Sequence, residues 1–307
     1  MIVRYTVTDK LPLPARTAIN VIQAALKVRR GEAESLIHDG TVRCAGRVVS
    51  QSHHRFKIGD EVEIDYAPQP IATGKKTKLK GRFEVLHDDE HIVVVNKPAG
   101  LLTVPTPKRE GNTLQSQVRK WLERCGTGRH AICVHRLDRG VSGVLVFAKS
   151  HETAELIREQ FAARKPQRKY IAIVQGKLTQ QTGTFKSYLC TDASLNRYSQ
   201  DDPNLGELAI THYEAKEVWK TTTLVQVQLE TGRRNQIRVH FAEAGHPIVG
   251  DPRYRPEQAA HPMWPLERIA LHAESLGIVH PHTRESMQFQ LPWPQEFRDF
   301  RRREQLR

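Results

Sequence analysis

The feature that most constrains the fold is a stretch near residue 70 that cannot contribute to a hydrophobic core. Pro68, Pro70 and Gly74 disfavour regular helix and strand there. The basic side chains of residues 67–82, which include no acid, are Lys75, Lys76, Lys78, Lys80 and Arg82. This composition predicts a flexible basic linker. The 307-residue chain is therefore expected to fold as two domains, residues 1–66 and 83–307.

The first domain is predicted to combine two helices with short strands. Apolar residues recur at i, i+3, i+4 and i+7 over residues 18–26, which indicates an amphipathic helix. A second helix around residues 33–37 is expected to end at Gly40, because glycine adopts the left-handed conformation without steric cost. The alternation that follows, over residues 41–64, is typical of small antiparallel strands.

The second domain shows strands and helices in an irregular order. Runs rich in β-branched and apolar residues predict strands at 92–95, 170–174 and 224–229. Amphipathic patterns predict helices around 156–161 and 236–244. Because strands and helices do not alternate regularly, the pattern favours an α+β fold over a doubly wound sheet.

The charge balance indicates a polyanionic partner. The chain has 47 Lys and Arg against 34 Asp and Glu, a formal net charge of +13 at pH 7. Much of this excess lies in the linker and in the basic C-terminal tail, residues 298–307. These two segments are either solvated, disordered connectors or tethers that bind phosphate groups.

Several other classes of protein lack sequence support. No apolar run approaches the roughly 18 residues of a membrane span, and the N-terminus lacks a secretory signal, so we expect a soluble cytoplasmic protein. The four cysteines lie far apart, which predicts neither disulfides nor a zinc site. Phosphate-binding, dinucleotide-binding and H-E-x-x-H motifs do not occur, so we expect no nucleotide cofactor and no catalytic metal.

One polar turn stands out as a candidate for chemistry. Residues 135–139 place Asp138 between Arg136 and Arg139, and Ser142-Gly143 and an apolar run follow. This pattern predicts that Asp138 lies on a loop at a sheet edge. Neighbouring arginines favour the ionised carboxylate, which could act as a nucleophile or a base rather than as a general acid. The alternative is an ion pair that only pins the loop.

This turn resembles the signature of the RluA-type RNA pseudouridine synthases. Other segments resemble motifs of the same family and occur in the same order, at residues 88–101, 168–170, 229–242, 245–251, 271–273 and 280–281. The resemblance implies a mixed, mainly antiparallel sheet, RNA as the partner, and catalysis by an aspartate without a cofactor. We further assume a monomer.

The resemblance also implies roles for individual residues. Asp138 matches the catalytic aspartate, which attacks or deprotonates the ribose, and Tyr170 matches the tyrosine that stacks on the flipped base. Arg238 matches the arginine that pairs with the aspartate and keeps it ionised and oriented. Arg136 matches the arginine that fills the stack left by the base, and Leu271 matches an apolar wall of the pocket.

Residues 1–66 resemble the S4 RNA-binding domain, in which basic side chains would contact RNA. The alternative is that these side chains only solvate the domain. The basic residues expected to contact RNA in the whole chain are Arg29, Arg30, Arg43, Arg47, Lys75, Lys76, Arg136 and Arg139. Two positions depart from the family pattern: Val141 stands where threonine is usual, and Asn235 stands where many relatives have histidine.

The leading hypothesis is an enzyme that isomerises specific uridines to pseudouridine in large-subunit ribosomal RNA. The reaction breaks one glycosidic bond, turns the uracil and joins it again through C5, so no group or electron is imported. Two alternatives stay open. One is the same reaction on transfer RNA, and the other is a non-catalytic RNA-binding or ribosome assembly protein with the same fold.

Overall fold

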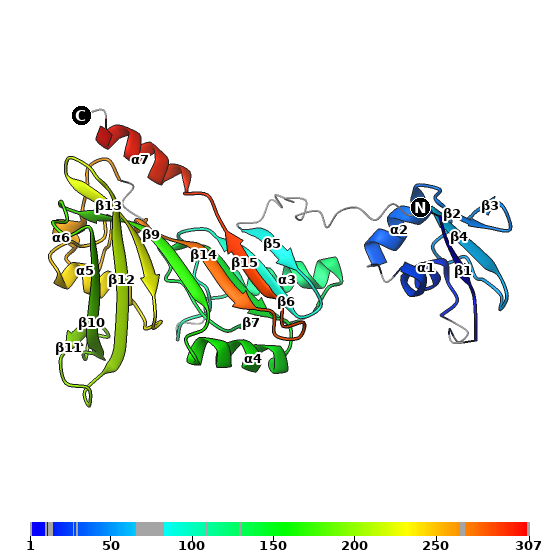
Figure 1. Ribbon diagram of the computed structural model, residues 1–307, viewed down its shortest axis with the longest axis horizontal. Helices are drawn as coiled ribbons and strands as arrows, with labels where there is room; N and C mark the ends of the chain where they lie inside the picture. Colours follow the sequence, from blue (N-terminus) through cyan, green and yellow to red (C-terminus); the bar gives the residue numbers. More distant parts are fainter. Residues whose placement is uncertain are drawn as a thin grey trace. The chain divides into compact units, whose positions relative to one another are not determined.

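The protein forms two compact units, residues 1–72 and 73–307, in a computed structural model (Figure 1). The structure describes residues 2–9, 11, 15–26, 28, 30–65, 83–107, 110–128, 130–264 and 268–305. The predicted linker lies outside the described residues, as do Arg29, Lys75 and Lys76. Within the described ranges, no helix is both long and apolar enough to cross a membrane.

The first unit packs two helices on a four-stranded antiparallel sheet with strand order β1-β4-β2-β3. Its elements are β1 (Ile2–Thr6), α1 (Ala18–Leu26), α2 (Arg30–His38), β2 (Val42–Cys44), β3 (Arg47–Val48) and β4 (Glu61–Asp65). Along β4, Val62 and Ile64 are buried whereas Glu61 and Asp65 are exposed. This alternation lets one face of the sheet form a core with the helices. The predicted pair of helices and small sheet are confirmed.

The second unit is built on an eleven-stranded sheet with the order β11-β10-β12-β13-β9-β14-β8-β6-β5 (Figure 1). Two further strands complete it, β15 against β14 and β7 against β8. The first strands are β5 (Glu84–Asp88), β6 (Ile92–Lys97), β7 (Ile132–Cys133), β8 (Ser142–Ala148), β9 (Gln167–Gln175) and β10 (Thr182–Thr191). The others are β11 (Arg197–Gln200), β12 (Glu207–Val218), β13 (Thr222–Leu229), β14 (Leu271–Val279) and β15 (Ser286–Gln290). Among the described strands, only β14 and β8 pair in parallel, so the mixed, mainly antiparallel α+β fold is confirmed.

Five helices formed by described residues accompany this sheet. They are α3 (Leu114–Cys125), α4 (His151–Ala162), α5 (Gln236–Glu243), α6 (Pro256–Ala259) and α7 (Gln295–Gln305). Helix α3 has a capping box between Thr113 and Ser116, and it ends at Gly126 in the left-handed conformation. Helix α5 follows β13 in the chain and contacts β11 and β12.

The strand after Asp138 lies inside the sheet, so the expectation of a sheet edge is wrong. Strand β8 runs between β6 and β14, and all seven of its residues are buried. A strand covered on both faces appears in the sequence as a continuous apolar run. This pattern does not distinguish a strand inside the sheet from a strand at its edge.

Gly143 allows β8 and β14 to approach closely. Its φ of +127° disfavours other residues, and a Cβ at this position would lie 2.2 Å from the carbonyl oxygen of Ala273. The same junction pairs Ser142 with His272. It therefore places the loop that carries Asp138 beside the first residues of β14.

The C-terminal basic segment lies in helix α7, so its interpretation as a disordered connector is wrong for residues 298–305. Phe297 and Phe300, three residues apart, are buried on one face of the helix. Arg301 donates to Glu217 at 2.8 Å. The charge of the segment concealed this apolar face.

Candidate active site

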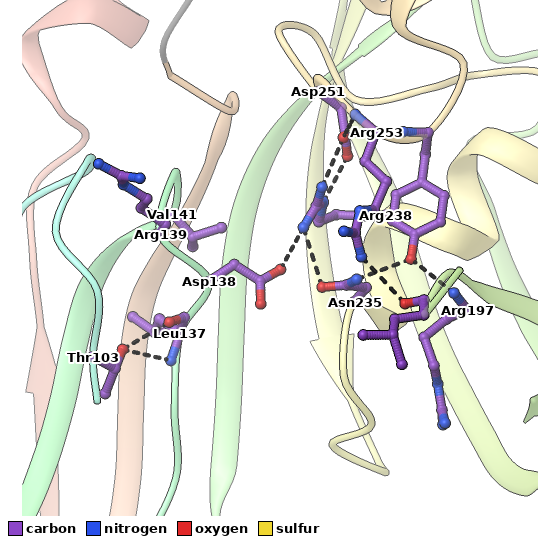
Figure 2. Close-up of polar contacts among 12 residues, drawn as sticks. Thr103, Leu137, Asp138, Arg139, Val141, Arg197, Asn235, Arg238, Asp251 and Arg253 are labelled. Atoms are coloured by element: carbon purple, nitrogen blue, oxygen red, sulfur yellow. Dashed lines mark hydrogen bonds and ion pairs between the residues drawn. The ribbon is translucent and has the colours of Figure 1, made fainter. Parts of the chain in front are cut away.

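Asp138 lies on the loop between β7 and β8, and short hydrogen bonds fix this loop. The hydroxyl of Thr103 donates to the carbonyl oxygen of Leu137 at 2.7 Å and accepts from the Leu137 N–H at 3.3 Å. The Val141 N–H donates back to the carbonyl oxygen of Asp138 at 3.1 Å. The backbone around Asp138 is therefore a closed turn with an anchored flank (Figure 2).

Lys97, at the end of β6, ties the same loop to the sheet. Its fully buried ammonium donates to the carbonyl oxygens of Val141 at 2.6 Å, Asp138 at 3.1 Å and Arg139 at 3.3 Å. A fourth contact, at 3.1 Å, goes to Pro98. Burial lowers the pKa of Lys97 to about 7, and the charge of Asp138 opposes this shift. The lysine thus uses its donors on backbone rather than on substrate.

Arg238, on α5, lies between two carboxylates (Figure 2). Its Nη1 donates to Asp138 Oδ2 at 2.8 Å, and its Nε and Nη2 donate to the two oxygens of Asp251 at 2.6 and 2.8 Å. The Asp251 pair is bidentate, which fixes the plane of the guanidinium. Arg238 can therefore hold Asp138 in one direction.

The two carboxylates differ in exposure, and this difference separates their possible roles. The side chain of Asp251 is fully buried, whereas that of Asp138 keeps 22% of its surface. Burial alone would lower the pKa of Arg238, but the hydrogen bonds and charge of Asp251, with those of Asp138, raise it above its ordinary value. Arg238 is thus a permanent cation, and only Asp138 is open to a ligand.

Asn235 and Tyr254 support Arg238 from the side. Asn235 has a left-handed backbone (φ +59°), which asparagine tolerates better than most residues. Its side-chain oxygen accepts from Arg238 Nη1 at 3.1 Å and its amide donates to the Tyr254 hydroxyl at 2.9 Å. The Tyr254 ring lies 5.1 Å from the Arg238 guanidinium carbon. The departure at Asn235 therefore keeps a polar contact with Arg238.

A cavity of about 410 Å³ opens beside Asp138. Tyr170, on β9, and Leu271, at the start of β14, line it, and both side chains are largely buried. Burial raises the pKa of Tyr170, although the nearby charge of Arg168 opposes the shift. The cavity thus offers a neutral phenol ring and an aliphatic wall beside a carboxylate, in the volume range of small-ligand sites.

The cavity is strongly basic. Asp138 is the one carboxylate among the described residues that line it. Its arginines are Arg136, Arg164, Arg168, Arg233, Arg234 and Arg238. This surplus of positive charge suits a ligand that carries phosphates.

The structure brings together five residues that the sequence marked. Asp138, Tyr170, Arg238, Arg136 and Leu271 all line the cavity. They come from three strands or strand-flanking loops and one helix, and the first and last of them, Arg136 and Leu271, are 135 positions apart in the sequence.

The other marked residues lie elsewhere. Arg139 is exposed, does not line the cavity and donates to the Gly100 carbonyl at 3.1 Å. Arg43 and Arg47 are exposed on β2 and β3 of the first unit. Arg30 is the first residue of α2.

Sequence reasoning missed the supporting roles of Lys97 and Asp251. Both belong to segments that resemble family motifs, at Asn96-Lys97-Pro98 and Gly250-Asp251. Nothing in the local pattern shows that Lys97 turns inward or that Asp251 reaches Arg238. Among the described residues, no group of three or more His, Cys, Asp or Glu side chains is arranged to hold a metal ion.

Comparison with known proteins agrees with this geometry. A family model described as RNA pseudouridylate synthase matches residues 91–243. The ribosomal large subunit pseudouridine synthase D of Zymomonas mobilis is 34% identical over 283 residues, which cover 88% of this chain and 87% of that protein. The dual-specificity RNA pseudouridine synthase RluA of Haemophilus ducreyi is 39% identical over 211 residues, or 67% of this chain and 91% of that protein.

A solved structure shows the same fold. Human RNA pseudouridylate synthase domain containing 4 superimposes with a TM-score of 0.59 at 22% identity, over 72% of this chain and 92% of that one. With these similarities, the chain belongs to the RNA pseudouridine synthase family of RluA/RsuA type. The predicted enzyme class, an isomerase acting on RNA, is confirmed.

The ion pair between Arg238 and Asp251 leads to a first prediction. Replacing Asp251 by Asn removes the bidentate acceptor and frees the guanidinium to rotate, so the single-turnover rate at saturating RNA should fall about 10- to 100-fold. Affinity for RNA should change little, because the buried Asp251 is closed to a ligand. Rapid-quench kinetics and filter binding measure the two quantities.

The control is Glu217→Gln, which removes a carboxylate that accepts a hydrogen bond from Arg301 and does not line the cavity. Breaking the buried Arg238–Asp251 pair costs about 3–5 kcal/mol of stability, whereas the Glu217–Arg301 pair is partly exposed and its loss costs less. Both variants are therefore assayed well below their unfolding midpoints. Equal rates for Asp251→Asn and wild type would show that Asp251 only stabilises the fold.

Proposed function

We propose that this protein converts uridine to pseudouridine in RNA with Asp138 as its catalytic carboxylate and without a cofactor. The observation that carries the proposal is the convergence of Asp138, Tyr170 and Arg238 on one basic cavity. An ionic tether on one side and a closed backbone turn on the other orient Asp138 towards the cavity. This is the preorganisation that a carboxylate needs to meet a sugar carbon or proton.

The reaction requires the target uridine to leave its base stack and enter the cavity, which costs a few kcal/mol. Arg136 is exposed at the cavity wall and can occupy the space that the base leaves. The Tyr170 ring offers a flat surface for the uracil. Asp138 then attacks C1′ or removes a proton from the ribose while the C1′–N1 bond breaks, and the uracil rejoins through C5.

Large-subunit ribosomal RNA is the substrate we propose. A relative that matches most of this chain is named for the ribosomal large subunit. The net charge of +13 and the arginines of the cavity are compatible with any RNA, so the choice of RNA rests on that similarity. Action in the cytoplasm, as a monomer, belongs to the same proposal.

The first unit is proposed to be an S4-like RNA-binding module. Its sheet exposes Arg43, which pairs in register with Glu63 on β4, and Glu63 in turn accepts from Arg4 at 2.9 Å. Arg43 and Arg47 therefore present positive charge on exposed strands rather than in the core. Phosphate contacts of this kind add affinity without reading sequence.

The central prediction concerns hydrogen release from the uracil ring. Ribosomal RNA labelled with tritium at uridine C5 should lose tritium to water with wild-type protein, because C5 exchanges its hydrogen for the bond to C1′. Asp138→Asn should lower the rate by about 10³-fold or more while still binding RNA.

The outcomes separate the alternatives. Release from transfer RNA but not from ribosomal RNA would replace the proposed substrate. Binding without release from either RNA would identify an RNA-binding or assembly protein on this fold. Unchanged release with Asp138→Asn would refute the role of the carboxylate.

A further prediction concerns the linker, which we propose binds phosphate groups. Replacing Lys75, Lys76, Lys78 and Lys80 by Gln should weaken RNA binding and flatten its dependence on salt, because fewer counterions are released. The single-turnover rate on bound RNA should stay the same. Affinities measured at several salt concentrations test this, and an unchanged slope would make the linker a passive spacer.

A further inference from the structure

Arg168 is a buried cation in the wall of the active-site cavity. It lies on β9 two residues before Tyr170, so the two side chains leave the strand on the same face. Only 8% of Arg168 is exposed, and it lines the cavity together with Tyr170. Neither the hydrogen bonds of Asp138 nor those of Arg238 involve it.

The guanidinium of Arg168 has few partners for a buried charge. Within the described part of the chain, its one hydrogen bond runs from Nη2 to the carbonyl oxygen of Glu230, at 3.2 Å. Its Nε is buried without a partner, and no carboxylate of the described residues forms an ion pair with it. Arg238, by contrast, contacts two carboxylates. One positive charge thus stands uncompensated beside the tyrosine.

The fold nevertheless holds this charge in place. The guanidinium carbon lies 5.5 Å from the centroid of the Phe161 ring, whose other neighbour is a stacked His135 ring. A Cβ at Gly232 would lie 2.2 Å from Arg168 Nη1. Gly232 does not have a positive φ, so the effect of a side chain at this position would be to displace the guanidinium of Arg168.

An unpaired buried cation costs stability, because burial disfavours the charged form. Accordingly, burial lowers the pKa of Arg168, and the nearby Tyr170 opposes the shift. A structure that retains such a cation in the cavity that Asp138 also lines points to a ligand that supplies the missing negative charge.

The proposed reaction creates such a charge. When the C1′–N1 bond breaks, its electron pair leaves with the uracil, which becomes an anion with charge shared by N1, O2 and O4. C1′ gains a bond to the Asp138 carboxylate, or a double bond to C2′ after that carboxylate takes the C2′ proton. When C5 bonds to C1′, the ring supplies the electron pair, and either the bond between C1′ and Asp138 breaks or the protonated Asp138 returns its proton to C2′. The C5 hydrogen then leaves as a proton, and N1 takes up a proton.

We propose that Arg168 is a catalytic residue that hydrogen-bonds to a carbonyl oxygen of the flipped uracil and stabilises the anion formed as the glycosidic bond breaks. This inference rests on the proposed function and assigns the charge-stabilising group of that site. Asp138 acts at the sugar, and Arg168 acts at the base.

The test compares two leaving groups. Arg168→Met should lower the single-turnover rate on uridine-containing RNA by about 100-fold, the effect of losing one donor to a developing anion. Fluorine withdraws electrons, so 5-fluorouracil leaves more readily and needs less help. With 5-fluorouridine at the target position, the deficit of Arg168→Met should shrink to about 10-fold or less. Chromatography of digested RNA measures loss of the parent nucleoside for both substrates.

The matched control is Lys169→Met, which removes a cation from the adjacent residue of the same strand, outside the cavity lining. It should react like wild type on both substrates at saturating RNA. Gly232→Ala gives a second route to the same defect, because its Cβ displaces the guanidinium without removing it. Thermal unfolding and RNA affinity are recorded for every variant.

A rate for Arg168→Met equal to wild type would overturn the inference, as would a deficit of the same size with both nucleosides. Failure of the proposed function looks different, because wild-type protein would then convert neither substrate.

Discussion

The site depends on one guanidinium that contacts two carboxylates. Arg238 joins a loop before β8, helix α5 and the turn after Gly250, three segments that the sheet alone does not hold together at this point. Asp251, fully buried, fixes the arginine, and the arginine directs the partly exposed Asp138. The polar backbone contacts of Lys97 complete the arrangement from the side of β6. In the proposed reaction, Asp138 is thereby positioned by residues whose hydrogen bonds go to protein groups.

Two arginines that line the same cavity differ in whether a carboxylate pairs with the guanidinium. Arg238 is neutralised by two acids, so it orients Asp138 and leaves little charge for a ligand. Arg168 has no acid partner among the described residues and leaves its charge available. The difference follows from their neighbours, since Arg168 packs against Phe161 and Gly232 rather than against a carboxylate. In the reaction we propose, Arg238 orients the carboxylate and Arg168 stabilises the uracil anion.

Local patterns predicted the local structure well. The helix over residues 18–26 and the strands of the second unit follow from apolar spacing, and family motifs selected Asp138, Tyr170 and Arg238, which meet in one cavity. Long-range packing was beyond these patterns. The parallel junction of Ser142 with His272 joins residues 130 positions apart, and it places β8 inside the sheet rather than at its edge. The burial of the Lys97 side chain against the loop is likewise determined by the tertiary structure, and no local sequence pattern predicts it.

A structure of Asp138→Asn bound to RNA that contains an unreacted target uridine tests the central claim most directly. In this complex we expect the uracil to be flipped and to lie against the Tyr170 ring, with C1′ facing the side chain at position 138. A uracil oxygen should lie within about 3.2 Å of the Arg168 guanidinium. Arg238 should still bind Asp251. A target uridine that remains stacked in the RNA, or that binds outside this cavity, would contradict the proposal that the uridine reacts in the cavity beside Asp138.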